Sequence, residues 1–100
     1  MSNSQENRFV GPVLKNSEVG DAIVEAIYED NNERKIEVEE HASYFRVKVE
    51  KECVIRFDTV SQMLGRDVTR ADIEANMPSL EGFIRVDSEK MRFLATATDT

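Results

Sequence analysis

The pattern of apolar and polar residues predicts one long helix followed by short strands. Between residues 17 and 30 the apolar residues recur at positions i, i+3, i+4, i+7 and i+8, the spacing of a helix with one buried face. Ser17 precedes this run and is the expected N-cap. Residues 44–50 (YFRVKVE) instead alternate apolar with polar side chains, which is typical of a half-buried strand.

Further strands follow the same two-residue period. Cys53–Phe57 alternates apolar and polar residues, and only two residues separate it from residues 44–50. We therefore expect these two strands to form an antiparallel hairpin. Phe83–Val86 and Met91–Ala95 predict another hairpin around a polar turn, and Lys35–Glu39 predicts a shorter strand that alternates with acids.

Two short helices are expected between these hairpins. Thr59 and Gln62 have the spacing of a capping box, so the first helix should begin at Thr59. Gly65 can end that helix in a left-handed conformation. Thr69 is the expected cap of the second helix, and Pro78 ends it because the residue before a proline avoids helical angles.

The N-terminal strand pattern, Phe9–Leu14, contains Gly11 and Pro12. Proline has no N–H group to donate to a sheet, so this strand is expected at a sheet edge or extended on the surface. Taken together, the elements predict one α+β domain with a mostly antiparallel sheet, one longer helix and two short helices.

The polar ends of the sequence are expected to lie outside this domain. We assign residues 1–8 to a flexible N-terminal tail, residues 9–97 to the domain and residues 98–100 to a loose C-terminus.

The 100-residue sequence has a formal net charge of −7, from 13 basic and 20 acidic residues. This balance argues against non-specific nucleic-acid binding, which needs clustered Lys and Arg. The sequence has no apolar run of membrane-spanning length, no basic amphipathic segment and no signal peptide pattern. A single cysteine, Cys53, fits a reducing compartment, so we expect a soluble cytoplasmic protein that binds neither nucleic acid nor membrane.

No residue pattern indicates catalysis or a metal site. His41 is the only histidine and follows Glu37, Glu39 and Glu40, but it lies in a polar turn and lacks a second histidine for a metal pair. Cys53 faces the apolar side of its strand, which favours a buried inert thiol over a nucleophile. We therefore expect neither a catalytic nor a metal-binding residue, and a protein-binding role follows mainly by elimination.

The first helix offers one candidate binding surface, because it carries five acids and no base. Glu18, Asp21, Glu25, Glu29 and Asp30 either form a solvated face or dock on a basic partner. The second reading would make the chain an acidic inhibitor or mimic. Charge reversal at Glu25 and Glu29 should abolish most binding by a mimic, but should mainly slow association by a protein that binds through another surface.

The run Thr59–Arg66 (TVSQMLGR) resembles the T-[VL]-x-x-x-LGR signature of the small effector, or coupling, proteins of soluble bacterial diiron monooxygenases. These proteins serve methane, phenol, toluene and alkene hydroxylating systems. Asn7–Val13, with its Val-Gly-Pro, is similar to the N-terminal approach of the toluene and alkene branch. Ile36–Glu39 resembles the family's acidic strand, and Gly82 and residues 92–93 match its later landmarks. The resemblance covers nearly the whole chain.

The resemblance implies a regulatory component rather than an enzyme, with no cofactor and no metal. It would dock on the large subunit of a diiron hydroxylase above the metal site, shape substrate access and couple electron delivery to oxygen activation. Its binding face would overlap that of the ferredoxin or reductase component. A monomer is expected when the protein is free.

The family's loop nearest the hydroxylase entrance corresponds to residues 76–82, although Pro78 and Leu80 stand where several relatives carry small hydroxyl residues. By resemblance, the docking residues are Gly11, Pro12, Gly65, Arg66, Asn76, Met77, Pro78, Ser79, Leu80 and Gly82.

The residue pattern leaves other roles open for some of these residues. Met77 and Leu80 either contact a partner or fill the core beneath the second short helix, and Arg66 either binds the last helix carbonyls or reaches a partner carboxylate. Under the docking hypothesis, Asn76→Ala or Leu80→Ala should alter substrate selectivity more than fold stability.

Overall fold

The computed structural model describes residues 8–97, which form three helices and seven strands. Of the tails expected at residues 1–8 and 98–100, only Arg8 is among the described residues, and its guanidinium donates to the Ala95 carbonyl. The elements in chain order are β1 (Phe9–Lys15), α1 (Glu18–Asp30), β2 (Ile36–Glu40), β3 (Tyr44–Glu50), β4 (Glu52–Arg56), α2 (Phe57–Leu64), α3 (Arg70–Ala75), β5 (Ser79–Glu81), β6 (Phe83–Val86) and β7 (Lys90–Leu94).

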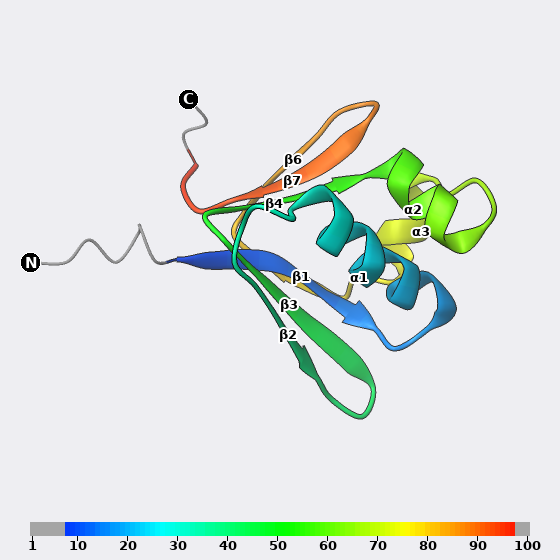
Figure 1. Ribbon diagram of the computed structural model, residues 1–100, viewed down its shortest axis with the longest axis horizontal. Helices are drawn as coiled ribbons and strands as arrows, with labels where there is room; N and C mark the ends of the chain where they lie inside the picture. Colours follow the sequence, from blue (N-terminus) through cyan, green and yellow to red (C-terminus); the bar gives the residue numbers. More distant parts are fainter. Residues whose placement is uncertain (1–7, 98–100) are drawn as a thin grey trace, which may run out of the picture.

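The strands form two antiparallel sheets, one of four strands in the order β2-β3-β1-β5 and one of three in the order β4-β7-β6. The sheets meet near the ends of the chain and diverge toward the opposite end, where the helices lie (Figure 1). This arrangement confirms the predicted α+β class with one longer and two short helices.

One hydrophobic core fills the space between the sheets and the helices. Its fully buried side chains come from both sheets and all three helices, and include Val10, Leu14, Ile23, Ile27, Val47, Val49, Ile55, Val60, Ile73, Met91 and Phe93. The apolar stripe predicted for the first helix is the buried face of α1. Its N-cap is Ser17, whose hydroxyl accepts a hydrogen bond from the Gly20 N–H at 3.0 Å, as expected.

The start of α2 differs from the capping-box prediction. The helix begins at Phe57, two residues earlier, and no side chain caps it. Thr59 instead donates its hydroxyl to the Asp30 carboxylate at 2.9 Å, and the same carboxylate accepts from the Arg56 N–H at 3.0 Å. The prediction was wrong because an acceptor from the end of α1, distant in sequence, serves this helix start.

The end of α2 and the start of α3 were predicted correctly. Gly65 ends α2 with a left-handed φ of 83°, and its N–H donates to the Ser61 carbonyl at 2.9 Å. Thr69 caps α3 in a capping box with Asp72.

The predicted hairpin of β3 and β4 does not form, because these strands belong to different sheets. Lys51 lies between them with a φ of 72°. Its N–H donates to the Arg8 carbonyl and its own carbonyl accepts from the Ala95 N–H. The turn therefore bonds to the residues flanking β1 and β7, and β4 pairs with β7 instead. The other hairpin, β6 with β7, was predicted correctly.

The edge position predicted for β1 is also wrong, since β1 lies between β3 and β5. Pro12 is tolerated there because the pairing of β1 with β3 is interrupted at Gly11 and Pro12, between the pairs Val10–Val49 and Val13–Arg46. The edge strand next to β1 is β5, whose residues were expected to be part of a loop.

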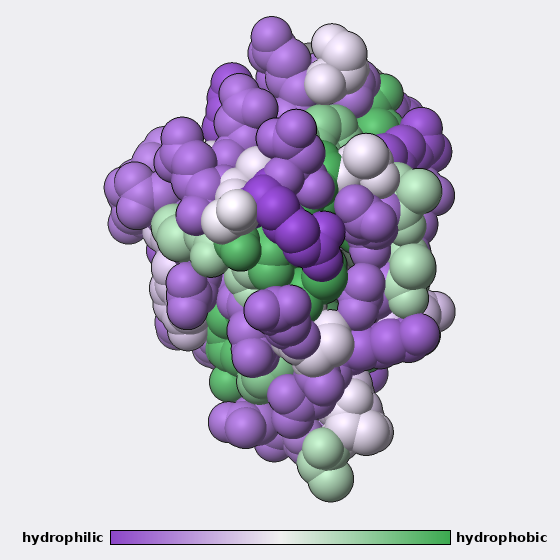
Figure 2. Space-filling model, turned by 90° about the vertical axis from the view of Figure 1, so that its right-hand side faces the viewer, coloured by the Kyte–Doolittle hydropathy of each residue, from purple (hydrophilic) through white to green (hydrophobic). Residues whose placement is uncertain are grey.

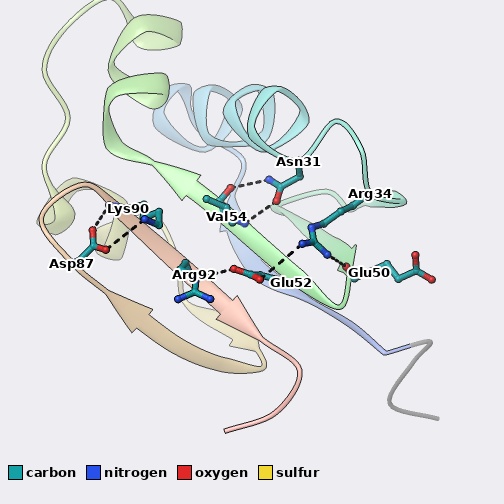
Figure 3. Close-up of polar contacts among 8 residues, drawn as sticks. All are labelled: Asn31, Arg34, Glu50, Glu52, Val54, Asp87, Lys90 and Arg92. Carbon is teal, nitrogen blue, oxygen red and sulfur yellow. Dashed lines mark hydrogen bonds and ion pairs between the residues drawn. The ribbon is translucent and has the colours of Figure 1, made fainter. Parts of the chain in front are cut away.

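Polar contacts join the two sheets to α1 and to the turn that follows it (Figure 3). The Glu52 carboxylate accepts from Arg92 Nε at 2.7 Å and lies 3.9 Å from a terminal nitrogen of Arg34. Arg34 also donates to the Glu50 carbonyl. At the end of α1, the Asn31 amide donates to the Val54 carbonyl and accepts from the Val54 N–H.

Candidate functional site

The segment from Asn76 to Gly82 reaches the surface and joins α3 to β6. Pro78 and Ser79 are exposed, while Asn76, Met77 and Leu80 are half-buried. The segment was expected to be a loop, but Ser79–Glu81 forms β5, which pairs with Gly11–Val13. The backbone of the candidate segment is thus held along the edge of the larger sheet by the middle of β1.

Asn76 anchors the start of this segment through four hydrogen bonds. Its side-chain oxygen accepts from the Ser17 hydroxyl at 2.8 Å, and its side-chain amide donates to the Asp72 carbonyl at 2.9 Å. Its backbone carbonyl accepts from the Lys15 N–H at 2.8 Å, and its N–H donates to the Ile73 carbonyl. Asn76 therefore ties the end of α3 to the turn between β1 and α1.

Met77 and Leu80 lie at the boundary between the core and the surface. Both pack against the hydrophobic core, yet both keep part of their surface accessible. Leu80 lies opposite Pro12 in the pairing of β1 with β5. Part of each side chain is therefore available to a partner, while the remainder stabilises the segment.

The backbone of the segment depends on close contacts at three residues, Gly11, Pro12 and Gly82. Gly11 and Pro12 are buried, and a Cβ atom on Gly11 would lie 2.5 Å from the Val47 carbonyl oxygen. Gly82 has a φ of 113°, and a Cβ atom there would lie 2.9 Å from the Leu94 carbonyl oxygen. The chain crosses from one sheet to the other at Gly82, and only glycine allows this close approach.

Gly65 and Arg66 are both exposed, but in the turn after α2. The described residues show no hydrogen bond or ion pair between this turn and residues 76–82. The charge of Arg66, together with hydrogen bonds from Thr69, lowers the pKa of Asp72; the backbone hydrogen bond from Thr69 is the largest cause. The structure thus places Gly65 and Arg66 at the helical end of the molecule without joining them to the segment.

Figure 2 looks on to this helical end, where α2, α3 and the start of α1 lie. Apolar side chains gather in the middle of a mostly polar surface there. Such a mixed surface is typical of a protein-binding face, with an apolar centre and a polar rim.

Several residues that surround the exposed part of the segment were not predicted from the sequence. A hollow of about 410 Å³ lies beside Pro78 and Ser79 and is also lined by Val13, Lys15, Ser43, Tyr44 and Arg46. Ser17 was recognised only as a helix cap, and not as the partner of Asn76. These neighbours depend on the pairing of β1 with β3 and β5, which leaves no local signal in the sequence.

Within the described residues, no group of His, Cys, Asp and Glu side chains could hold a metal ion. His41 stacks on Tyr44 with 4.4 Å between ring centroids and lies 3.6 Å from Glu39. Cys53 is buried, and its desolvation, with the charge of Asp30 next in effect, raises the pKa of the thiol far above its ordinary value of 9.0. A neutral thiol in the core is unsuited to act as a nucleophile.

No helix in the described part of the chain is both long and apolar enough to cross a membrane.

Known proteins resemble this chain in sequence and in fold. The MmoB/DmpM family matches residues 8–94. The effector subunit of the alkene monooxygenase system of Xanthobacter autotrophicus strain Py2 is 31% identical over 88 residues, covering 88% of this chain and 87% of that protein.

Two solved structures extend the likeness to the fold. A chain of a phenol hydroxylase–regulatory protein complex superposes with a TM-score of 0.77 at 25% identity, covering 87% of this chain and 98% of that chain. Regulatory protein B of soluble methane monooxygenase superposes with a TM-score of 0.67 at 22% identity, covering 97% of this chain and 70% of that one. These relatives are named effector or regulatory proteins rather than catalytic subunits. The chain therefore belongs to the MmoB/DmpM family of monooxygenase effector proteins, as the resemblance at Thr59–Arg66 predicted.

Proposed function

We propose that this chain docks on the large subunit of a diiron hydroxylase and regulates it without catalysing a reaction itself. The observation that carries the proposal is the family match over residues 8–94, together with the likeness to a chain from a phenol hydroxylase–regulatory protein complex. The docked protein would shape substrate access, support oxygen activation and couple it to electron delivery.

The docking face in this proposal centres on the accessible part of residues 76–82. Pro78 and Ser79 would contact the hydroxylase directly because they are exposed, and Asn76, Met77 and Leu80 would contribute their exposed portions. The buried residues Gly11 and Pro12, together with the half-buried Gly82, would instead fix the backbone of this face.

Gly65 and Arg66 would form a second contact at the helical end. The exposed guanidinium of Arg66 can pair with a carboxylate of the hydroxylase, whereas the left-handed turn at Gly65 sets the direction in which Arg66 leaves the helix.

The remaining parts of the proposal concern the free protein and its competitors. We propose that the free chain is a cytoplasmic monomer, and that its docking face overlaps the surface used by the ferredoxin or reductase component. If so, excess effector should slow electron transfer to the hydroxylase even where a lower dose increases turnover.

The proposal is tested by adding purified protein to a diiron hydroxylase encoded beside it. We expect turnover and product distribution to change with the dose and to reach an optimum near one effector per active site. Heat-denatured protein is the control for non-specific effects. Turnover and coupling that are indifferent to the native protein would refute the proposal.

The alternative of an acidic mimic predicts a different response to charge reversal on α1. Of the five acids on this helix, Asp30 is engaged inside the molecule by Arg56 and Thr59, whereas Glu25 and Glu29 are exposed. Glu25→Lys with Glu29→Lys should therefore leave the equilibrium affinity for the hydroxylase nearly unchanged if residues 76–82 dominate docking. A mimic would lose most of its binding.

A further inference from the structure

The outer face of the four-stranded sheet carries a groove that no element of the described chain covers. Val13 on β1 pairs with Arg46 on β3 and with Ser79 on β5, so these side chains share one face of the sheet. The hollow of about 410 Å³ beside Pro78 and a second hollow of about 250 Å³ share Val13 and Arg46 among their lining residues. The two hollows therefore lie side by side across β1 and β3, and together they are called the outer groove.

The outer groove is rich in cations although the protein is acidic. Lys15, Arg46 and Lys48 line it, and Glu81 is the only acid among its lining residues. The Glu81 carboxylate lies 3.4 Å from Arg8. The cations that line the groove therefore outnumber its one acid, in a sequence with a net charge of −7.

The charge of the groove is only partly neutralised within the chain. Glu39 on β2 lies 2.8 Å from Lys48 and 4.0 Å from Arg46, so one carboxylate serves two cations there. Among the described residues, Lys15 has no ion pair. Lys15 is also exposed, which leaves its ammonium free to bind a carboxylate from another molecule.

The floor of the groove between these cations is apolar. Val13 and Tyr44 are half-buried and Pro78 is exposed beside them. This combination of an apolar floor and flanking cations fits a chain segment that presents an apolar side chain next to a carboxylate.

We propose that the outer groove binds an extended, carboxylate-bearing segment of the hydroxylase. Its carboxylate would lie at Lys15 and Arg46, and an apolar neighbour would cover Val13 and Pro78. This inference rests on the proposed function and extends the docking face, because Pro78 and Ser79 belong both to the docking segment and to the wall of the groove.

Charge and continuity favour the hydroxylase over a second copy of this chain. Two copies would each bring a net charge of −7 to the contact, and such self-repulsion keeps acidic proteins apart. A hydroxylase bound at residues 76–80 would already be adjacent to the groove. Its occupant would then be held by the same docking event.

The test compares Lys15→Glu with Lys35→Glu. Both lysines are exposed and the two variants have equal net charge, but Lys35 lies outside the groove and pairs only with the exposed Glu37 at 4.0 Å. We expect Lys15→Glu to raise the Kd for the hydroxylase about tenfold and to weaken its salt dependence, and Lys35→Glu to change the Kd less than threefold. A carbodiimide cross-link from Lys15 to a hydroxylase carboxylate should form with the unmodified protein.

The outcomes separate the two proposals. If the unmodified protein leaves hydroxylase turnover unchanged, the proposed function itself fails. If turnover responds but Lys15→Glu and Lys35→Glu bind equally well, only the groove inference is overturned. It is also overturned if Lys15→Glu abolishes self-association instead of hydroxylase binding. The NMR signals of Val13 and Tyr44 are a further check. If they shift when residues 1–7 are removed, the groove binds the chain's own N-terminus and the groove inference is overturned.

Discussion

Asn31 and Asn76 occupy the same position relative to their helices, the C-cap of α1 and of α3, but they hold different parts of the molecule. Asn31 is buried, with 1% of its surface exposed, and its side chain makes three hydrogen bonds to backbone atoms of Ile27 and Val54. Asn76 is half-buried, and its side chain bonds to the Asp72 carbonyl and to the Ser17 hydroxyl.

The difference lies in what each side chain replaces. β4 is an edge strand, and Asn31 supplies the donor and acceptor that a further strand would give to Val54. Asn76 instead meets a hydroxyl near the surface that also caps α1, so water can replace either partner. A buried side chain thus closes the core beside β4, whereas a half-buried one holds the candidate docking segment.

The largest effect is expected for Asn31→Ala. The substitution leaves the N–H and C=O groups of Val54 without partners, and each buried group left unpaired costs about 1–3 kcal/mol. We expect the free energy of unfolding, measured with denaturant, to fall by about 3 kcal/mol. The exposed neighbour Asn32 is the control, and Asn32→Ala should change stability by less than about 0.5 kcal/mol. A loss below about 1 kcal/mol for Asn31→Ala would contradict the assigned role.

Asn76→Ala should have the next largest effect. It removes two side-chain hydrogen bonds near the surface, so we expect a loss of about 1–2 kcal/mol in the free energy of unfolding. This revises the expectation from sequence that the change would alter selectivity more than stability. Hydrogen exchange of residues 77–81 should also quicken.

A double-mutant cycle with Ser17→Ala tests whether Asn76 acts through Ser17. Ser17→Ala alone should cost about 1 kcal/mol because it also removes the cap of α1. The two changes should couple by at least about 0.5 kcal/mol if the hydrogen bond between them matters. Strict additivity would show that Asn76 stabilises the segment only through Asp72 and the backbone.

These two asparagines also show which features were readable in the sequence. The helices follow from local signals: the apolar stripe of residues 19–27, the glycine at position 65 and the capping box at Thr69 all act within a few residues. The bonds of Asn31 to Val54 have no such local signal, because the two residues are 23 positions apart. No local pattern specifies such a contact.

The errors in the sheets and in the site have the same cause. The pairing of β4 with β7, and of β1 with β5, joins segments far apart in the chain, whereas the sequence suggested pairing between neighbours. The position of residues 76–82 was identified by resemblance to a family, not by physical signals. Its anchor at Ser17 and its neighbours Val13 and Arg46 became apparent only once the register of β1 was known.

Leu80→Ala probes the side of the segment that faces the core. Because Leu80 is half-buried, we expect a stability loss of about 1–2 kcal/mol, below the range for a fully buried leucine. The product distribution of the hydroxylase should change as well. Ile84→Ala removes the same number of carbons from a half-buried side chain on β6, and it should alter stability alone. Equal product distributions for both variants would show that Leu80 has only a structural role.

The smallest expected effect is a pH dependence of stability that arises from the capping box at the start of α3. Hydrogen bonds from Thr69, chiefly from its backbone N–H at 3.0 Å, lower the pKa of the Asp72 carboxyl below its ordinary value of 3.8. A carboxyl whose pKa is lower in the folded state stabilises the fold above its unfolded pKa, and this contribution is lost as the pH falls through the folded-state pKa.

We therefore expect Asp72→Asn to be slightly less stable than the unmodified protein near pH 7, with a difference that shrinks below about pH 4. Denaturant unfolding at several pH values measures this difference. Asp67→Asn is the matched control, because Asp67 is exposed in the preceding turn and makes no hydrogen bond or ion pair within the described residues. A difference for Asp72→Asn that stays constant down to pH 2.5 would show that the capping box stabilises α3 without its charge. The start of α3, which leads into Asn76, would then be insensitive to the protonation of Asp72.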